Sequence, residues 1–524
     1  MSACPVISLT LHAHLPFMDH SEEPNTPEEW KFFEALSETW LPLLETLGRL
    51  DKDHIPFRLA ISLSPVLCHL LTDELLIARY LRFTDKQIEF GAREIERTRG
   101  NGGLQQLARY YYDRAIEKRV FFTERCEGNI LKALKFYQQK GKLELLVTAA
   151  THAFLPFYTA YPETIQAQLE VAIASYRLNF GKLAQGFWLP ELGWSGELET
   201  YLRAYNFGYT IVDTHSLVFG QPPAEKGCFY PARTPRGIFI LGRDFYAQKD
   251  LGRLVREPVY RDRRRDAGYE LPPEQVKPFL HANDGRTCTG YKYWNGGKDN
   301  TPYDPLRARL TAREGASAFL ERLVQRLNTA GGYMNFPPVS LLALPIDSFG
   351  RSWYEGPEFI ETLFREGNRR GDLQFMTPAE YIYKQDGESF QTLVPGFSSW
   401  GVNGYGEMWL DSSNDWMYRH TMRALERMTE IAERFPNNTG LKERTLNQAA
   451  REILLVLSSD WSKMLYKQEY SEYARDKIES GLRNFTTIYE ALGSNYISTE
   501  WLTGLEKRHN IFPNINYRVF RRKH

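Results

Sequence analysis

The segment VISLTLHAH, residues 6–14, opens a pattern that recurs along the chain and decides the fold. A short apolar run, Val6–Leu11, leads directly into polar residues. Similar runs that end in polar or aromatic residues follow at 143–148, 186–189, 209–212, 238–241 and 339–346. Runs of this length predict strands, and the segments between them carry apolar residues at helical spacing. Strands that alternate with helices predict βαβ units and a parallel sheet, with the polar residues at the carboxyl ends of the strands.

Two segments interrupt this alternation. Residues 80–140 hold two long charged helical patterns around the turn RGNGG at 99–103, which predicts an inserted helical hairpin. From residue 415 onward only helical patterns occur. We therefore predict an α/β fold with a discontinuous β/α barrel over 1–79 and 141–414, a helix-turn-helix insertion over 80–140 and a helical domain over 415–524.

The composition indicates a soluble globular protein. Its 65 basic and 65 acidic residues give a formal net charge of zero, so neither nucleic acid nor an anionic membrane is expected as a partner. No stretch approaches 18 consecutive apolar residues, and the start of the chain lacks the basic region of a signal peptide. The five cysteines form no CxxC pair and predict free thiols. A cytoplasmic protein is the expectation.

Two carboxylates follow predicted strands and are candidates for catalysis. Glu191 lies in GFWLPELGW, residues 186–194, and Asp347 ends SLLALPID, residues 340–347. A carboxylate nucleophile paired with a second carboxyl group that acts as acid and base is what a retaining glycosidase needs. Taken alone, Glu191 also fits a helix cap or a salt bridge.

His12 and His14 stand at the end of the first predicted strand. HxH is also a metal-ligand pattern, which makes a metal-dependent hydrolase an alternative. His152 is the remaining candidate partner, and it fits a hydrogen bond to a sugar hydroxyl or to a catalytic carboxylate equally well.

Basic residues follow a further predicted strand. Arg243 and Asp244 fit the orientation of a nucleophile, the binding of hydroxyl groups or a structural ion pair. The run RDRRR at 261–265 lies among acidic residues in a neutral chain, so we expect an ion-paired loop there and no polyanion site.

Aromatic residues make up 14% of the chain, which suits either carbohydrate stacking or an aromatic core. Trp400, Trp409 and Trp416 lie among glycines in residues 398–416. Their spacing fits one side of a buried helix, but glycines disfavour a helix and let a backbone approach a ligand closely. We interpret this segment as a binding loop.

Several of these motifs, in this order, resemble the motif regions of glycoside hydrolase family 57. The five that carry the resemblance are HAHLPF (12–17), ATHAFLPF (150–157), GFWLPELGW (186–194), LPIDSFGRSWYEG (344–356) and SSWG (398–401). YTIVDTHSL (209–217), ILGRD (240–244), GYKYW (290–294) and SSDW (458–461) extend it over nearly the whole chain. The length and the closing helices look most like the 1,4-α-glucan branching enzymes of that family.

The resemblance implies a distorted seven-stranded β/α barrel with an inserted helical hairpin and a C-terminal helical domain. It also implies a retaining mechanism without a metal or other cofactor, in which Glu191 is the nucleophile and Asp347 the general acid/base. The remaining residues that it assigns to substrate binding are His12, His14, His152, Trp188, Arg243, Trp30, Trp294, Trp400, Trp409, Arg261 and Asp460.

The activity that the resemblance implies is cleavage of an α-1,4 linkage and transfer of the chain to a 6-hydroxyl, in glycogen synthesis, by a monomer acting on amylose or a glycogen-like glucan. Two departures from the family pattern keep alternatives open. The motif around Asp347 is two residues shorter than usual, and the loop after Asp244 is short. An α-1,4-glucan hydrolase and a catalytically weak glucan-binding protein are therefore the other expectations.

Overall fold

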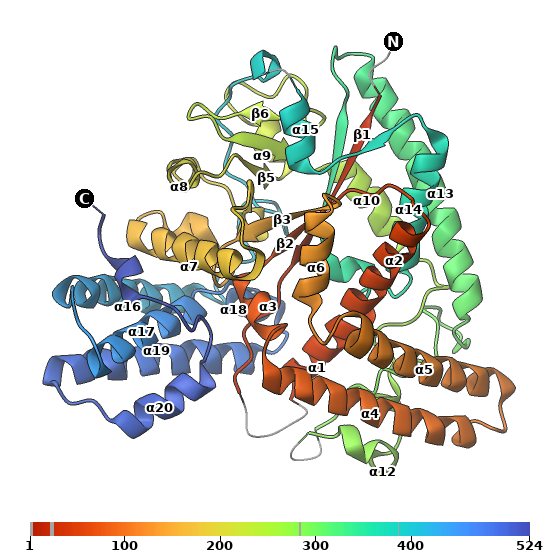
Figure 1. The fold of residues 1–524 in the computed structure, drawn as a ribbon, viewed down its shortest axis with the longest axis horizontal. Coiled ribbons are helices and arrows are strands. Elements are labelled where there is room, and N and C mark those ends of the chain that lie inside the picture. Colours follow the sequence, from red (N-terminus) through yellow and green to blue (C-terminus); the bar gives the residue numbers. More distant parts are fainter. Residues whose placement is uncertain (1–3, 21–25, 282–284, 386, 524) are drawn as a thin grey trace.

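The computed structural model describes residues 4–20, 26–281, 285–385 and 387–523, and a curled β-sheet surrounded by helices forms its centre (Figure 1). The strands follow the order β6-β7-β5-β4-β3-β2-β1-β8, and β9 pairs with β1. Their bounds are β1 Val6–Ala13, β2 Leu59–Leu63, β3 Leu143–Thr148, β4 Gly186–Trp188, β5 Tyr209–Val212, β6 Ala232–Arg233, β7 Phe239–Gly242, β8 Val339–Pro345 and β9 Gln374–Phe375.

The sheet is a distorted barrel of parallel strands. From β7 along the path to β8, each strand is parallel to its neighbours, and β6 is antiparallel to β7. Beyond the two ends of this path, the backbone N–H of Asp244 donates to the carbonyl of Leu341 at 2.9 Å. This hydrogen bond links the residues after β7 to β8. The seven parallel strands confirm the predicted fold class.

Burial explains why these segments are strands. All eight residues of β1 are buried, as expected for a parallel strand that is covered on both faces. The predicted strands at 143–148 and 209–212 have the predicted bounds. Strand β2 was not predicted, because the small Ala60 and the polar Ser62 interrupt its apolar run.

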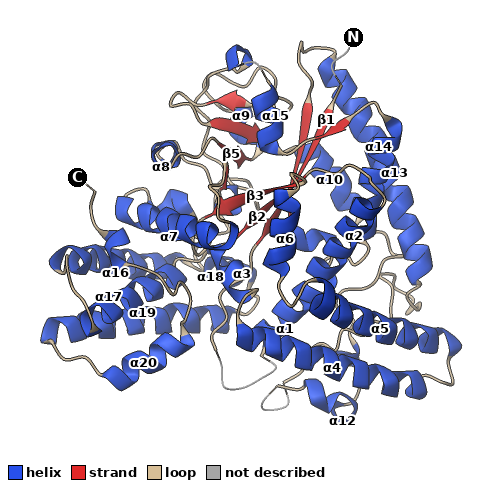
Figure 2. Ribbon diagram, viewed as in Figure 1, coloured by secondary structure: helices blue, strands red, loops and turns tan. Residues whose placement is uncertain are grey.

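Further helices lie around the barrel and beside the long helices of the inserted hairpin (Figure 2). They are α1 Pro27–Glu34, α2 Leu41–Lys52, α3 Pro65–Leu70, α6 Ile130–Gln139, α7 Pro162–Phe180, α8 Leu198–Ala204, α9 Thr214–Val218, α10 Phe245–Leu254, α11 Ala267–Glu270, α12 Pro273–Val276, α13 Pro305–Gly331, α14 Gly356–Arg370 and α15 Pro378–Lys384. A π-helical segment, η1 (Ala35–Trp40), joins α1 to α2, and a 3-10 turn, η7 (Ile346–Phe349), follows β8.

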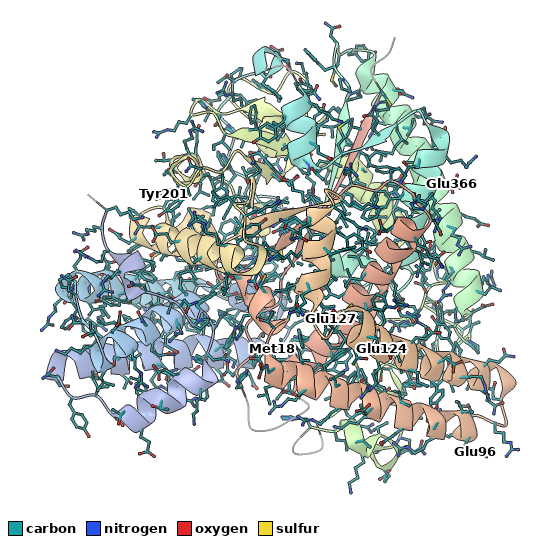
Figure 3. The ribbon with its side chains drawn as sticks, in the orientation of Figure 1. Met18, Glu96, Glu124, Glu127, Tyr201 and Glu366 are labelled. Carbon is teal, nitrogen blue, oxygen red and sulfur yellow. The ribbon has the colours of Figure 1, made fainter. Side chains whose placement is uncertain are left out.

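A hairpin of two long helices projects from the barrel. Helix α4 (Glu74–Arg97) and helix α5 (Gly102–Val120) begin at the side-chain caps Asp73 and Asn101. Figure 3 shows Glu96 near the free end of this hairpin. The division of the chain into domains stays a prediction, although α4 begins before residue 80.

The C-terminal region consists of helices that pack on one another (Figure 1). They are α16 Asp415–Arg434, α17 Leu441–Val456, α18 Ser459–Lys467, α19 Ser471–Ser494 and α20 Thr499–Arg508. The five cysteines are free thiols, which confirms that prediction. Among the described residues, none of the helices combines the length and the apolarity needed to cross a bilayer.

Buried charges connect the C-terminal helices to the N-terminal part of the chain. His509 Nδ1 lies 2.7 Å from Glu452 Oε1, and its Nε2 lies 3.5 Å from Asp19 Oδ1. Lys477 also contacts Asp19 at 2.5 Å. Burial lowers the pKa of His509, but the hydrogen bonds to Asp19 and Glu452 outweigh that effect and raise the pKa to about 9. The charged imidazolium is therefore part of the folded state.

We expect this contact to make stability depend on pH on the alkaline side. Because the pKa of His509 is higher in the folded than in the unfolded chain, its contribution is complete below pH ~6.5 and disappears as the pH rises through about 9. This shift in the pKa of His509 corresponds to a contribution of about 3 kcal/mol to the free energy of unfolding. This contribution is measured by thermal unfolding of wild type and His509→Gln between pH 6 and 10. His420→Gln, which changes an exposed histidine, is the control. If the Tm of wild type and that of His509→Gln depended on pH in the same way, His509 would not be the source of the pH dependence.

Candidate active site

A cleft of about 340 Å³ opens at the carboxyl ends of the parallel strands. His12 lies on β1 and His14 just beyond it, while His152, Glu191 and Asp347 follow β3, β4 and β8. Segments far apart in the sequence thus bring the predicted histidines and both predicted carboxylates into one cleft.

Helix α18 contributes the wall of this cleft that comes from the C-terminal region. Asp460 and Lys463 line it. The helix is fixed by backbone contacts with the segment after β3, because the N–H of Ser459 donates to the carbonyl of His152 at 3.2 Å. The hydroxyl of Thr151 also donates to the carbonyl of Leu454 at 2.5 Å. The C-terminal helices are therefore part of the site.

Glu191 is held in an unusual backbone conformation. Its φ of 56° and ψ of 19° lie in the left-handed region, and its residue is only 1% exposed. A non-glycine residue held there costs about 1–3 kcal/mol, which neighbouring contacts must offset. The N–H of Trp400 donates to the Glu191 carbonyl at 2.9 Å, and the indole N–H of Trp400 donates to Oε2. These two contacts fix both the backbone and one carboxylate oxygen.

The other carboxylate oxygen of Glu191 meets the C-terminal helix. The hydroxyl of Ser459 donates to Oε1 at 3.1 Å, and Lys463 Nζ lies 3.8 Å from the same atom. The charge of Glu191 is the main reason why the pKa of Lys463 is raised. A buried carboxylate thus has a donor or a cation at each oxygen, as a buried charge requires.

A directed chain of hydrogen bonds leads from Ser62 to Glu191. Ser459 has one hydroxyl proton and donates it to Glu191, so its contact with His152 Nδ1 at 2.9 Å must be donated by the imidazole. A neutral His152 then accepts at Nε2, from His12 Nε2–H at 2.7 Å. His12 Nδ1 in turn accepts from the hydroxyl of Ser62 at 3.2 Å. Each link determines the direction of the next.

The electrostatics of the two histidines agree with this chain. Burial lowers the pKa of His12 well below its ordinary value, and the neighbouring His14 and Lys463 lower it further. Burial likewise lowers the pKa of His152, followed by the effects of His14 and His12. Both imidazoles are therefore neutral near pH 7. Trp188 supports His12 from one side, with ring centroids 4.8 Å apart and planes inclined by 1°.

His14 links the first strand to helix α18. Its Nδ1 lies 2.8 Å from the hydroxyl of Ser64 and its Nε2 lies 2.7 Å from Asp460 Oδ2. Burial raises the pKa of Asp460, but His14, Ser458 and Lys463 outweigh it and lower the pKa to about 2. His12 and His14 are thus side by side, with ring centroids 6.4 Å apart, and each of their ring nitrogens faces a polar side chain.

Asp347 lies on η7, directly after β8. Arg351 donates to its Oδ2, and the N–H of Ser352 donates to its carbonyl at 2.8 Å. The N–H of Arg351 donates to the hydroxyl of Thr39 on η1 at 3.1 Å. The shortened motif DSFGRSWYEG therefore forms a tight turn in which Arg351 both contacts the candidate acid/base and packs against η1.

Six predicted substrate-binding residues are not among the described residues that line the cleft; they are Trp30, Trp188, Arg243, Arg261, Trp294 and Trp409. Trp409 is fully buried, and its ring stacks on that of Phe154 with centroids 5.0 Å apart. Arg243 is buried and paired with Asp213.

Arg261 lies away from the cleft. Its guanidinium is buried, donates to Glu38 at 2.7 Å and lies 3.8 Å from the centre of the Tyr354 ring. The indole N–H of Trp294 donates to Glu270 at 2.7 Å. Trp30 and Arg261 instead line a separate small cavity. These residues have protein partners and do not face the cleft.

Three residues of the site were not predicted. Ser459 stands beside Asp460 in the SSDW motif, and Arg351 lies in the motif of Asp347. Both could therefore have been found from motifs that the sequence already shows. Lys463 follows Asp460 by three residues, which places both on one face of α18 once the helix is known. Nothing else in the sequence distinguishes Lys463 from the other surface lysines.

The hydrogen-bond chain predicts fixed tautomers. We expect His12 to carry its proton on Nε2 and His152 on Nδ1, with both rings neutral near pH 7 because burial lowers their pKa values. Nitrogen-15 NMR of the histidine rings measures this directly. His215 is the contrast, because its hydrogen bond to Asp213 raises its pKa. Opposite tautomers, or a midpoint near pH 6.5 for either ring, would refute the chain.

Comparisons with known proteins agree with this fold. A family model described as glycosyl hydrolase family 57 matches residues 8–262, and one described as the C-terminal region of 1,4-alpha-glucan branching enzyme matches residues 420–520. A 1,4-alpha-glucan branching enzyme of Thermococcus kodakarensis is 26% identical over 97% of this chain and 77% of its own length.

Solved structures are similar over the whole chain. The crystal structure of the alpha-amylase AmyC from Thermotoga maritima is 32% identical, covers 99% of this chain and 100% of its own, and superposes with a TM-score of 0.92. A branching enzyme from Pyrococcus horikoshii is 23% identical, covers 100% of this chain and 98% of its own, with a TM-score of 0.90, and shares the fold. The family match, the extent of these likenesses and the composition of the cleft together show that the chain belongs to glycosyl hydrolase family 57.

Proposed function

We propose that this chain is a 1,4-α-glucan branching enzyme that works by retaining double displacement. The observation that carries the proposal is that helix α18 brings Ser459, Asp460 and Lys463 into the cleft of Glu191 and Asp347. Helix α18 lies in the segment matched by the model of the branching-enzyme C-terminal region. The named relative from Thermococcus kodakarensis supports the same activity.

In the first step, Asp347 gives its proton to the oxygen of an α-1,4 linkage while Glu191 attacks the anomeric carbon. The bond between the anomeric carbon and that oxygen breaks, and a glucosyl ester forms on Glu191. The shortened glucan leaves with a free 4-hydroxyl. Lys463 and the hydroxyl of Ser459 stabilise the carboxylate before attack, and Trp400 keeps it oriented.

In the second step, the carboxylate of Asp347 takes a proton from the 6-hydroxyl of another glucan chain. The 6-oxygen attacks the anomeric carbon, the ester bond breaks and Glu191 returns to a carboxylate. Two inversions at the same carbon leave its configuration unchanged. The product carries an α-1,6 branch.

Substrate binding is assigned to the residues that line or support the cleft. Half-buried Trp400 offers a ring for stacking, supported edge-on by Trp188 at 5.6 Å. The glucan hydroxyls would meet His12, His14, His152 and Asp460. The proposal needs no cofactor, and it places the protein in the cytoplasm as a monomer acting in glycogen synthesis.

Hydrolysis is the second candidate, and two observations favour it. Helix α10 begins at Phe245, directly after its cap Asp244, so little chain is left there to cover the acceptor side of the site. The structure that is 32% identical is described as an alpha-amylase. If water reaches the glucosyl ester before a 6-hydroxyl does, Asp347 activates water and a reducing end results.

The nucleophile assignment is tested by Glu191→Gln. We expect turnover of amylose to fall by at least about a thousand-fold, because the amide does not form the ester. Affinity for maltoheptaose, measured by calorimetry, should stay close to that of wild type. The exposed Glu197→Gln is the matched control. Undiminished turnover in Glu191→Gln would refute the mechanism.

The choice between transfer and hydrolysis is tested by proton NMR of amylose incubated with the protein. New α-1,6 signals that outnumber new reducing ends are expected for a branching enzyme. Reducing ends alone would establish a hydrolase. Neither signal, together with retained glucan binding, would mean that the shortened Asp347 motif has removed catalysis and left a binding protein.

A further inference from the structure

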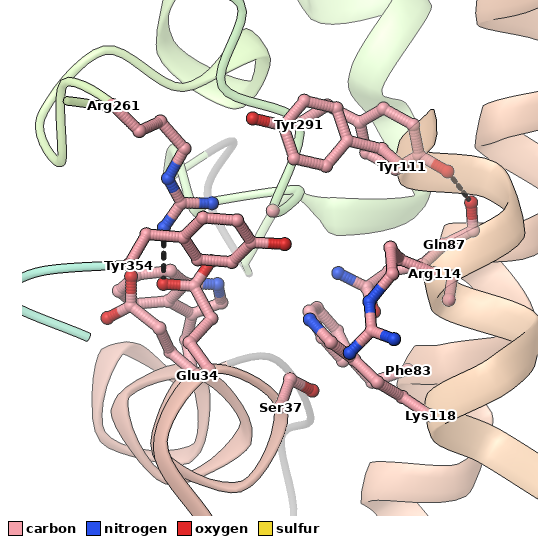
Figure 4. Close-up of a pocket in the computed structure, with 14 residues that line it drawn as sticks. Glu34, Ser37, Phe83, Gln87, Tyr111, Arg114, Lys118, Arg261, Tyr291 and Tyr354 are labelled. Atoms are coloured by element: carbon pink, nitrogen blue, oxygen red, sulfur yellow. Dashed lines mark hydrogen bonds and ion pairs between the residues drawn. The ribbon is translucent and has the colours of Figure 1, made fainter. Parts of the chain in front are cut away.

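A second, much smaller cavity lies between the helical hairpin and the barrel. It measures about 30 Å³, enough for one or two water-sized species and too little for a sugar ring. Figure 4 shows Arg114 and Lys118 of α5 on one side, and Arg261, Glu34 and Tyr354 on the other. This cavity shares no lining residue with the catalytic cleft.

Most cations in and around the cavity are paired. Lys292 Nζ lies 2.7 Å from Glu34, and Arg261 lies 2.7 Å from Glu38. Arg114 lies 2.9 Å from Glu45. Lys292, Arg261 and Arg114 therefore have carboxylate partners at hydrogen-bond distance.

Lys118 is the exception. Its residue is 9% exposed, and among the described residues its ammonium group has no carboxylate oxygen within 4.0 Å and makes no hydrogen bond; it lies 5.7 Å from the centre of the Tyr354 ring. Burial, then the charge of Arg114, lowers the pKa of Lys118 to about 8. A buried charge without a partner is costly, and a mobile counter-ion would remove that cost.

Arg261 offers further donors to the same space. Its Nε and Nη1 are buried and have no hydrogen-bond partner within the described chain, although Nη2 donates to Glu38. The cavity is thus lined by the ammonium group of Lys118, by the guanidinium of Arg261 with the Tyr354 ring against it, and by the carboxylates of Glu34 and Glu38, which are already paired with Lys292 and Arg261. This combination is complementary to an anion.

We propose that this cavity binds a single halide ion, held by Lys118 and Arg261. The volume selects the class of anion, because a monatomic ion fits about 30 Å³ and a tetrahedral sulfate or phosphate does not. The ion would join α5 of the hairpin to the barrel. Through Glu38 and Thr39 on η1, it would also support the turn that holds Arg351 and Asp347.

The test is made on the full chain. Crystals soaked in bromide should show an anomalous peak within hydrogen-bond distance of Lys118 Nζ and Arg261. In solution, replacing gluconate by chloride at constant ionic strength should raise the Tm of wild type by about 2 °C. Lys118→Met should abolish that rise, whereas Lys132→Met, which alters an exposed lysine on the neighbouring helix α6, should retain it.

Three results would overturn the proposal. One is the absence of a bromide peak in wild-type crystals, which decides the matter even if Lys118→Met does not fold. Another is a peak without any chloride dependence of Tm, which would mean an adventitious ion only. A rise in Tm with sulfate equal to that with chloride would also contradict a site of this size.

Discussion

The burial of one negative charge governs the arrangement of this molecule. A carboxylate that is removed from water must be compensated on every side, and Glu191 is compensated by Trp400, Ser459 and Lys463. One of these residues belongs to the loop after the barrel and two to helix α18. The contacts of the candidate active site therefore form only when the C-terminal helices are docked. Folding of the barrel and completion of the site are coupled for that reason.

The charges of the protein fall into networks with different roles. Around the cleft, neutral histidines relay hydrogen bonds while Asp460 and Lys463 carry the charges. Around the small cavity, Glu34 and Glu38 form buried ion pairs with Lys292 and Arg261. Arg351 connects the two regions, because its side chain faces Asp347 and its backbone contacts Thr39. The turn of Asp347 is thus supported by charged groups that lie outside the cleft.

The sequence allowed the fold class and the main carboxylates to be predicted, because strands of a parallel sheet have apolar runs and place polar residues at their ends. It did not predict which tryptophans and arginines face the cleft. Trp409 and Arg261 look like ligand-binding residues in a sequence, yet packing against Phe154 and pairing with Glu38 occupy them. Lys463 was missed for the opposite reason, since an ordinary helical lysine acquires its role only from the docking of α18.

The hydrogen-bond chain from Ser62 to Glu191 has a consequence for how such a sequence can evolve. Each member has a single proton to give, so exchanging one of them for a residue with a different number of protons reverses or breaks every later link. Selection then acts on the set and not on its members. Ser62, His12, His152 and Ser459 should be inherited as one unit, although they come from the two ends of the chain.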